Sequence, residues 1–524
     1  MSPKEKEVSS AEQQKKEALA ALDSAGWSSS HTRAVLVAGT GFLTDSYDNF
    51  VIGLMVPMMA YGLGLPKGKF PGYWDTSFLK AASAWGNLFG QLGFGILGDV
   101  IGRKKMYGVE LIILMVGAFG CAQTAAPGYG LTFLSIMCFW RFLLGVGVGG
   151  DYPVSSVITA EFAGSRMRGT MMALVFSMQG VGTILGTVVS IVTLSAYKDQ
   201  IDANSKALDM VWRWMALFGL VPCLMAVYYR LTISETPRYT LEVEGNAAQA
   251  IADAKQFIEG GELVEGIATA KPEDKKPYWT EFKQYFGQWK NFKVILGCAM
   301  CWFLVDIGFY GTNLNTKAVL DAIGYVDPHA SPFDDNWKTA VGQLIINLCG
   351  YVPGYLFSIA LIDRVGRKPI QLLGFVVLTT CFAVLAASFD QSAVKSGKLN
   401  PTSLSNPAFI AIYCCAQFFF NFGPNTTTFI LPAEVFPTRF RSAAHGICAA
   451  CGKLGAILAL QFFQIVADHE DPFNPKSSDK ANINFGTTLW IFAATCALGI
   501  PFTFLVPETK GKTLEEIHEE RDAL

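Results

Sequence analysis

Twelve long apolar stretches constrain this chain more than any other feature of its sequence. Each is about 20 residues or longer, the length that a helix needs to cross the hydrocarbon core of a bilayer. A charged segment, 232–291, separates the sixth stretch from the seventh and is too polar to enter lipid. The sequence therefore predicts an all-α membrane protein with twelve transmembrane helices in two sets of six. The stretches are residues 34–60, 78–98, 106–126, 131–161, 170–196, 212–231, 292–320, 340–362, 370–389, 407–434, 442–467 and 485–506.

The composition agrees with a lipid-embedded chain and excludes several other classes of protein. Hydrophobic residues make up 51% and charged residues 16%, whereas soluble proteins carry about 25% charged residues. The formal net charge of −2 excludes a strongly basic nucleic-acid binder and an acidic disordered chain. The two C-x-x-C pairs, 298/301 and 448/451, lie in apolar runs, where cysteine is a small hydrophobic residue, so we expect no metal site.

The polar segments divide the chain into five parts. Residues 1–33 contain no apolar run typical of a secretory signal, and the linker is expected to be helical around 245–258. The expected parts are an N-terminal segment 1–33, a six-helix bundle 34–231, a linker 232–291, a second six-helix bundle 292–506 and a C-terminal tail 507–524.

Short basic loops indicate how the chain is oriented in its membrane. They contain Arg103, Arg166, Arg367 and Arg439, and all four follow even-numbered spans. They therefore lie on one side, which the positive-inside rule makes cytosolic, together with both termini.

The two sets of six spans carry the same acidic and basic residues at matching positions. Asp363 lies 264 positions after Asp99, and both precede a Gly-Arg-Lys triplet at close range. Glu434 lies 273 positions after Glu161, and both have arginines five and seven residues later. These matches indicate two pseudo-symmetric six-helix bundles, an architecture typical of secondary transporters with a site between the halves.

Several motifs resemble those of the major facilitator superfamily. G-x-L-x-D-x-x-G-R-K at 95–104 is similar to its signature, and 235–239 (ETPRY) and 507–511 (PETKG) resemble its sugar-porter branch. Three further stretches resemble the proton-coupled inorganic phosphate transporters of fungi and plants, apart from Val154, where that family usually has Leu. They are GGDYPVSSVITAE at 149–161, WFLVDIGFYG at 302–311 and NFGPNTTT at 421–428.

The resemblance implies a multi-pass plasma-membrane protein that imports inorganic phosphate together with protons. It implies that the chain is not an enzyme and needs no cofactor, and that arsenate mimics phosphate. The 507–511 motif leaves a sugar or polyol symporter as an alternative, although Lys453 inside a span argues against it. A nutrient receptor that signals without net transport is a second alternative.

Charged residues inside the spans indicate a structural or functional role, because each costs at least about 2.5 kcal/mol when the span inserts into the membrane. They can carry protons, or they can form structural ion pairs within the bundle. We expect the proton pathway to include Asp45, Asp48, Asp151 and Asp306.

Trp302, Asp306 and Tyr310 are spaced four residues apart and so share one helical face. Indole N–H and phenol O–H groups can donate to an oxyanion, but an ionised carboxylate about 4 Å away would oppose it by roughly 4 kcal/mol at an effective dielectric near 20. Protonation of Asp306 would therefore couple proton binding to phosphate binding. Gln179 and Asn425 could instead join neighbouring helices by hydrogen bonds. The predicted phosphate-binding residues are Tyr152, Gln179, Trp302, Asp306, Tyr310, Asn425 and Lys453.

Charged residues at the cytosolic end are expected to pair and to hold the protein in its outward-facing state. The predicted gating residues are Asp99, Arg103, Glu161, Arg166, Asp363, Arg367, Glu434 and Arg439.

Overall fold

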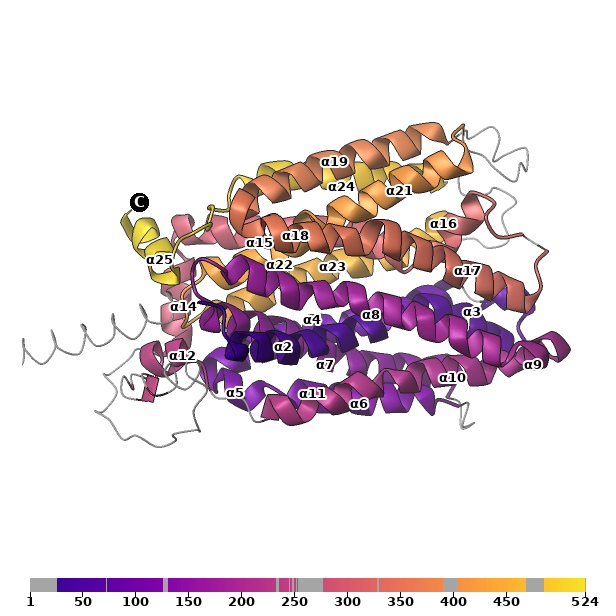
Figure 1. The fold of residues 1–524 in the computed structure, drawn as a ribbon, viewed down its shortest axis with the longest axis horizontal. Coiled ribbons are helices and arrows are strands. Elements are labelled where there is room, and N and C mark those ends of the chain that lie inside the picture. The colour runs from indigo at the N-terminus through magenta and orange to yellow at the C-terminus, as the bar shows by residue number, and fades with distance from the viewer. Residues whose placement is uncertain are drawn as a thin grey trace, which may run out of the picture.

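The computed structural model is a bundle of long helices that run side by side (Figure 1). Nine segments within its described residues are long and apolar enough to cross a membrane. The described residues are 26–71, 73–125, 131–231, 235–244, 246, 249–250, 252, 277–327, 329–389, 403–467 and 485–523.

Three further spans complete the predicted twelve, and each has a physical reason for being less regular or less apolar. The first is two helices, α2 (Ser29–Phe50) and α3 (Ile52–Gly62), and α2 contains two aspartates. The second, α4 (Tyr73–Val100), carries several polar side chains. The tenth is interrupted between α21 (Asn406–Asn421) and α22 (Pro424–Val435), because proline has no N–H to continue the helix.

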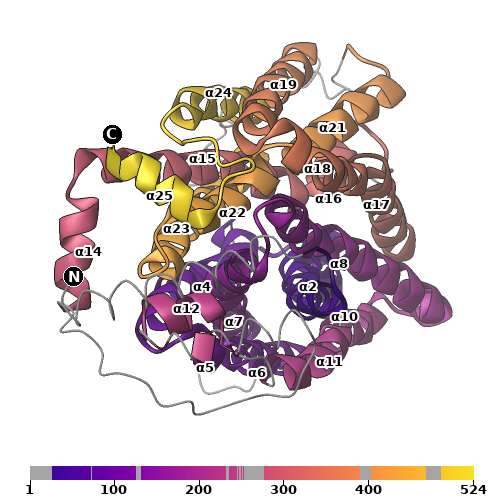
Figure 2. The same cartoon turned by 60° about the vertical axis from the view of Figure 1, so that its left-hand side comes forward.

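The helices fall into two groups (Figure 2). The N-terminal half holds α2 to α11, and the C-terminal half holds α15 to α24. Besides α2, α3 and α4, the N-terminal half contains α5 (Arg103–Met106), α6 (Val109–Ala122), α7 (Phe133–Phe162), α8 (Arg168–Ala196), α9 (Lys198–Ala203), α10 (Leu208–Phe218) and α11 (Leu220–Leu231). Besides α21 and α22, the C-terminal half contains α15 (Trp289–Asn313), α16 (Thr316–Ala322), α17 (Pro332–Ile346), a π-helical turn (Asn347–Tyr351), α18 (Val352–Val365), α19 (Arg367–Ser388), α23 (Arg441–Ala467) and α24 (Phe485–Thr503).

Three short helices lie at one end of the bundle, at the left of Figure 1. They are α12 (Pro237–Glu242), α14 (Tyr278–Phe286) and α25 (Leu514–Ala523). The loops with Arg103, Arg166, Arg367 and Arg439 lie at this same end, which we call the basic end.

The helices at the end of the linker and of the seventh span differ from the sequence predictions. The seventh span was expected over 292–320, but α15 ends at Asn313 and α16 is a separate helix. The linker was expected to reach residue 291, whereas α15 begins at Trp289. The helix predicted around 245–258 lies almost wholly outside the described residues.

Glycines allow α4 and α7 to pack with their backbones in contact. A Cβ atom on Gly145 would lie 2.1 Å from the carbonyl oxygen of Ser83, and one on Gly90 would lie 2.3 Å from that of Val146. Small residues at helix interfaces permit such approach in membranes. Glycines also bring the halves together, because a Cβ on Gly446 of α23 would lie 2.3 Å from the Gln91 oxygen of α4.

Gly145→Ala should destabilise the protein by about 1–3 kcal/mol, the usual cost of forcing extra atoms into a packed interface. The measurement is thermal unfolding of purified protein in detergent. Gly93→Ala, in the neighbouring helix α4, is the matched control because a Cβ there meets nothing within 4 Å. Equal unfolding temperatures for the two variants would contradict this account of α4–α7 packing.

Candidate functional site

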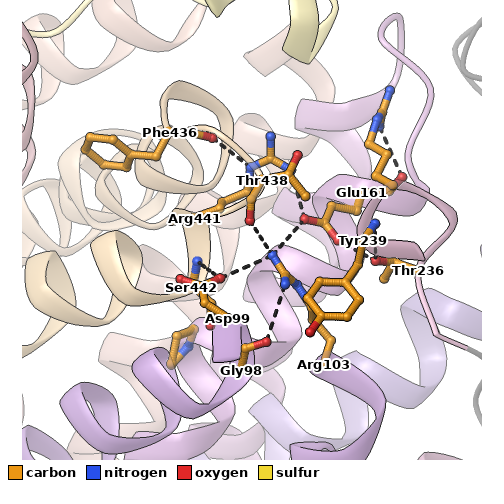
Figure 3. A network of polar contacts seen from close by, with 12 residues as sticks. Gly98, Asp99, Arg103, Glu161, Thr236, Tyr239, Phe436, Thr438, Arg441 and Ser442 are labelled. Carbon is orange, nitrogen blue, oxygen red and sulfur yellow. Dashed lines mark hydrogen bonds and ion pairs between the residues drawn. The ribbon is translucent and has the colours of Figure 1, made fainter. Parts of the chain in front are cut away.

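The carboxylate of Asp99, at the end of α4, caps a helix of the opposite half (Figure 3). Its oxygens accept the backbone N–H groups of Ser442 at 3.1 Å and Ala443 at 2.8 Å, both in the first turn of α23. Those N–H groups have no partner within their own helix, and a negative charge there also complements the helix dipole. Asp99 therefore joins the two halves at the basic end.

Asp363, at the end of α18, makes the equivalent contact in the opposite direction. It accepts the backbone N–H groups of Gly169 at 3.2 Å and Thr170 at 2.7 Å, in the first turn of α8. The Thr170 hydroxyl donates to it as well, at 2.7 Å. The repeat seen in the sequence thus appears in space as two reciprocal caps, one from each half.

An arginine and a glutamate accompany each capping aspartate. Arg103 lies 3.2 Å from Asp99 and 3.4 Å from Glu161, and it donates to the carbonyl oxygen of Thr438 in the other half at 2.6 Å. Arg441 reaches Glu161 across the same interface at 2.9 Å. These charges are buried, so each cation neutralises carboxylates that would otherwise be costly.

In the C-terminal half Arg367 takes the corresponding position. It contacts Glu434 at 2.7 Å and 3.0 Å, and Asp363 at 2.8 Å. The predicted gating residues Asp99, Arg103, Glu161, Asp363, Arg367 and Glu434 therefore meet at the basic end. We call these six residues the latch.

The two other predicted gating residues lie apart from the latch. Arg166 is exposed. Arg439 pairs with Glu281 of α14, and α14 in turn reaches the latch through the Tyr278 hydroxyl, which donates to Asp99 at 3.3 Å.

The Glu-Thr pairs of the two sequence motifs support the latch, a role that sequence reasoning did not assign to them. Thr236 donates to Glu161 and Thr509 to Glu434, each at 2.5 Å. Glu235 accepts the backbone N–H of Lys104 at 3.0 Å. Burial raises the pKa of the Glu235 carboxyl, while the nearby Arg103 guanidinium and the backbone N–H donors oppose this rise.

At the middle of the bundle, Lys453 of α23 joins two residues of α15. Its ammonium group donates to Asp306 at 2.8 Å and to the Tyr310 hydroxyl at 2.9 Å. It also lies 5.6 Å from the ring centre of Tyr152, in the opposite half. Trp302 packs one turn away against Gly452, where a Cβ would lie 2.5 Å from the indole ring.

Gln179 and Asn425 form a second group that connects α8 with α22. The Gln179 side-chain oxygen accepts from the Tyr355 hydroxyl at 2.5 Å and from the Asn425 amide at 3.3 Å. Asn425 also donates to Asn421 at 2.8 Å. All seven predicted binding residues are thus buried at the centre of the bundle. Sequence reasoning missed Tyr355, although Tyr351 and Tyr355 place two hydroxyls one helical turn apart in an apolar span.

Aromatic side chains lie between these central groups and the basic end. The ring of Phe429 is 4.5 Å from that of Phe176 and 5.1 Å from that of Phe42, centre to centre. Helices α2 and α8 start at the basic end, and on them Phe42 and Phe176 come before the residues at the centre of the bundle. Helix α22 ends at the basic end, and on it Phe429 comes after Asn425. This apolar layer and the latch close the centre of the bundle on that side.

A second buried charge cluster lies within the N-terminal half. Arg230 of α11 donates to Asp151 at 2.6 Å and 2.8 Å, and to Glu110 at 2.9 Å. Gly41 makes room for the guanidinium group, because a Cβ there would lie 1.4 Å from it. Asp45 is buried beside Asp151. The carboxyl groups of Asp45, Asp151 and Glu110 therefore share one neighbouring cation, Arg230.

Sequence reasoning missed Glu110, Arg141 and Arg230. The free-energy cost of placing a charged side chain in a membrane span points to these residues in the same way as it pointed to the aspartates. Arg141 donates to the Asp48 backbone oxygen at 3.5 Å and to Ser83 at 2.9 Å. Asp48 itself is buried. Each predicted proton-pathway aspartate is therefore inside the bundle, and Asp151 and Asp306 are paired with cations.

Arg230→Met should destabilise the protein by about 3–5 kcal/mol, because it leaves the Asp151 and Glu110 carboxylates buried without their cation. Adding Asp151→Asn should restore part of the loss by removing one of those charges. Thermal unfolding of the two variants and of Asp151→Asn alone completes the cycle. Additive effects of the two changes would contradict a direct charge interaction.

The chain is similar to known transporters over nearly its whole length. Residues 34–520 match the family model "Sugar (and other) transporter". A repressible high-affinity phosphate permease of Neurospora crassa is 41% identical, over 96% of this chain and 89% of that protein. The inorganic phosphate transporter PHO84 of Saccharomyces cerevisiae is also 41% identical, over 96% and 86% of the two chains.

A plant relative and a solved structure extend these similarities. A probable inorganic phosphate transporter 1-4 of Oryza sativa is 37% identical, over 96% of this chain and 95% of that one. The structure of the major facilitator proton:xylose symporter XylE of E. coli matches with a TM-score of 0.70, at 20% identity, over 94% of this chain and 99% of the other. The chain therefore belongs to the sugar (and other) transporter family and has the major facilitator fold.

Proposed function

We propose that this protein is a symporter of protons and inorganic phosphate that works by alternating access between its two halves. The observation that carries the proposal is the buried ammonium group of Lys453, bound to Asp306 and Tyr310 between the halves. A cation at this place suits an anionic substrate better than a neutral sugar. Relatives that are named as phosphate transporters support the same substrate.

Phosphate and Asp306 compete for the same cation. An ionised Asp306 occupies Lys453 and opposes a phosphate monoanion about 4 Å away by roughly 4 kcal/mol at an effective dielectric near 20. Protonation of Asp306 removes that opposition and releases an N–H donor of Lys453 toward the substrate. At 1.4 kcal/mol per decade, one proton then changes phosphate affinity about a thousandfold, which is sufficient to couple the two.

Neutral donors from both halves complete the proposed binding site. Tyr152 and Gln179 come from the N-terminal half, and Trp302, Tyr310 and Asn425 from the C-terminal half. Phosphate bound by both sets draws the halves together, so binding energy is available for the conformational change. The cluster of Asp45, Asp151 and Arg230 is a second place where a proton resides, with Asp48 beside it on α2.

In this proposal the latch holds the basic end closed, and we assign this end to the cytosol. The two halves, residues 34–231 and 292–506, then move as units around the central site, joined by the linker and with both termini in the cytosol. A plasma-membrane location and transport of arsenate as a phosphate mimic complete the proposal.

Uptake of radiolabelled phosphate into proteoliposomes tests the function directly. An inward proton gradient should drive saturable accumulation, and arsenate should compete with phosphate whereas xylose should not. Absence of uptake by correctly folded protein would overturn the symporter and favour a receptor. Uptake of sugar instead of phosphate would establish the alternative substrate.

Asp306→Asn should abolish proton-driven accumulation while preserving phosphate binding, because the amide keeps the shape of the carboxyl group but carries no proton to transfer. Equilibrium binding and gradient-driven uptake, measured on the same preparation, separate the two effects. Lys453→Ala should weaken binding more than Lys453→Arg does. Gradient-driven accumulation by Asp306→Asn at the wild-type level would exclude Asp306 as the coupling residue.

Asp99→Asn should favour opening of the basic end, because it weakens the charged cap on α23 and the pair with Arg103. A cysteine at Ser442, which is buried between the halves, reports opening through its rate of maleimide labelling in purified protein. The rate should rise about three- to tenfold, as expected for a lost charged cap of about 1 kcal/mol. Arg166→Ala, at an exposed basic residue outside the latch, should leave the rate unchanged, and equal rates for both variants would contradict the latch.

A further inference from the structure

A cleft lined by both apolar and polar side chains lies between the two halves, toward the end opposite the basic end. We call it the outer cleft. None of the described residues that line it is acidic, and most of its polar groups are hydroxyls and amides. Its polar lining includes Thr183 and Thr187 of α8, Lys317 of α16, Thr339 and Gln343 of α17, and Asn347 of the π-helical turn.

The outer cleft ends close to the central site. Phe50 lines the cleft, and its ring stacks on that of Tyr310, with centres 5.6 Å apart and planes at 21°. The Tyr310 hydroxyl in turn accepts the hydrogen bond from Lys453. One aromatic pair therefore separates the outer cleft from the central cation.

Lys317 is the single charged residue among the described residues that line the cleft. Its ammonium group contacts Asp321 at 3.4 Å and also Asp335. An ammonium group has three N–H donors, so two carboxylates leave one donor for an anion in the cleft. Lys69, near Asp321, adds positive charge at the same place.

A hydrogen-bonded bridge crosses the cleft at the π-helical turn. Gln343 donates to Asn347 at 3.0 Å, and Asn347 donates to Thr187 of the opposite half at 3.4 Å. Single π-helical turns occur frequently at functional sites. The bridge consists of neutral hydrogen bonds, and an anion can take the place of their accepting oxygens, since the Gln343 and Asn347 amide N–H groups can donate to a phosphate oxygen instead.

We propose that the outer cleft is a second binding site for inorganic phosphate, occupied before the anion passes Phe50 into the central site. The proposal rests on the proposed function, since it concerns the substrate of the same pathway. Lys317 attracts the anion, and the threonine and amide groups replace part of its hydration shell. A charge-assisted hydrogen bond from the Lys317 ammonium group supplies most of the affinity.

The first experiment compares the uptake kinetics of Lys317→Gln with those of the wild type. For Lys317→Gln we expect the phosphate KM to rise about five- to tenfold while kcat changes less than about twofold, because the central site is intact. Lys317→Arg should restore the wild-type KM. Lys198→Gln removes a neighbouring exposed cation that does not line the cleft and is the matched control. A fall in kcat with constant KM would overturn the binding site and indicate a structural role for Lys317 at the gate.

The second experiment does not require transport. A cysteine at Thr339 is labelled with a membrane-impermeant thiol reagent in the Lys453→Ala background, where the central site lacks its cation. Inorganic phosphate should slow labelling at least about threefold, whereas chloride at equal ionic strength should not, and Lys317→Gln should abolish the protection. Absence of protection would overturn the outer site even if uptake of phosphate is confirmed. If phosphate protects the cysteine at position 339 but the wild-type protein takes up no phosphate, the outer site is upheld and the symporter is overturned.

Discussion

The carboxylates of Asp99 and Asp363 each hold the first turn of a helix that belongs to the other half. Around them, Arg103 and Arg367 neutralise two glutamates that cannot reach water. This arrangement meets three structural requirements at the same time. It satisfies helix N–H groups that have no partner in their own helix, it pairs charges that are expensive in lipid surroundings, and it fixes how the halves face each other.

The central site depends on that closure. With the basic end held shut, Lys453 and Asp306 meet in a space bounded by Phe42, Phe176 and Phe429 on one side and by the Phe50–Tyr310 pair on the other. Electrostatic interactions strengthen when water is excluded. A single protonation there therefore has a larger effect on an anion than the same event at an exposed carboxylate.

The number of spans, the repeat and the group of polar residues buried at the centre of the bundle could be predicted from the sequence because each leaves a visible signal. Three such signals can be recognised without coordinates: a charge in an apolar run, a four-residue spacing and a motif that occurs twice. Tyr355 was missed because an uncharged hydroxyl in an apolar span is common, and Arg230 and Glu110 because they lie near the ends of their spans. The pairing of Arg439 with Glu281 could not be foreseen, since it depends on how α14 folds back onto the basic end.

The reciprocity of the two caps has a consequence for how the protein changes state. Each cap joins a different pair of helices, α4 with α23 and α8 with α18, so a rocking motion that separates the halves at this end breaks both together. The glycine-lined contact of α4 with α23 also holds backbone against backbone at this interface. We therefore expect the two caps to open together, in a single cooperative event.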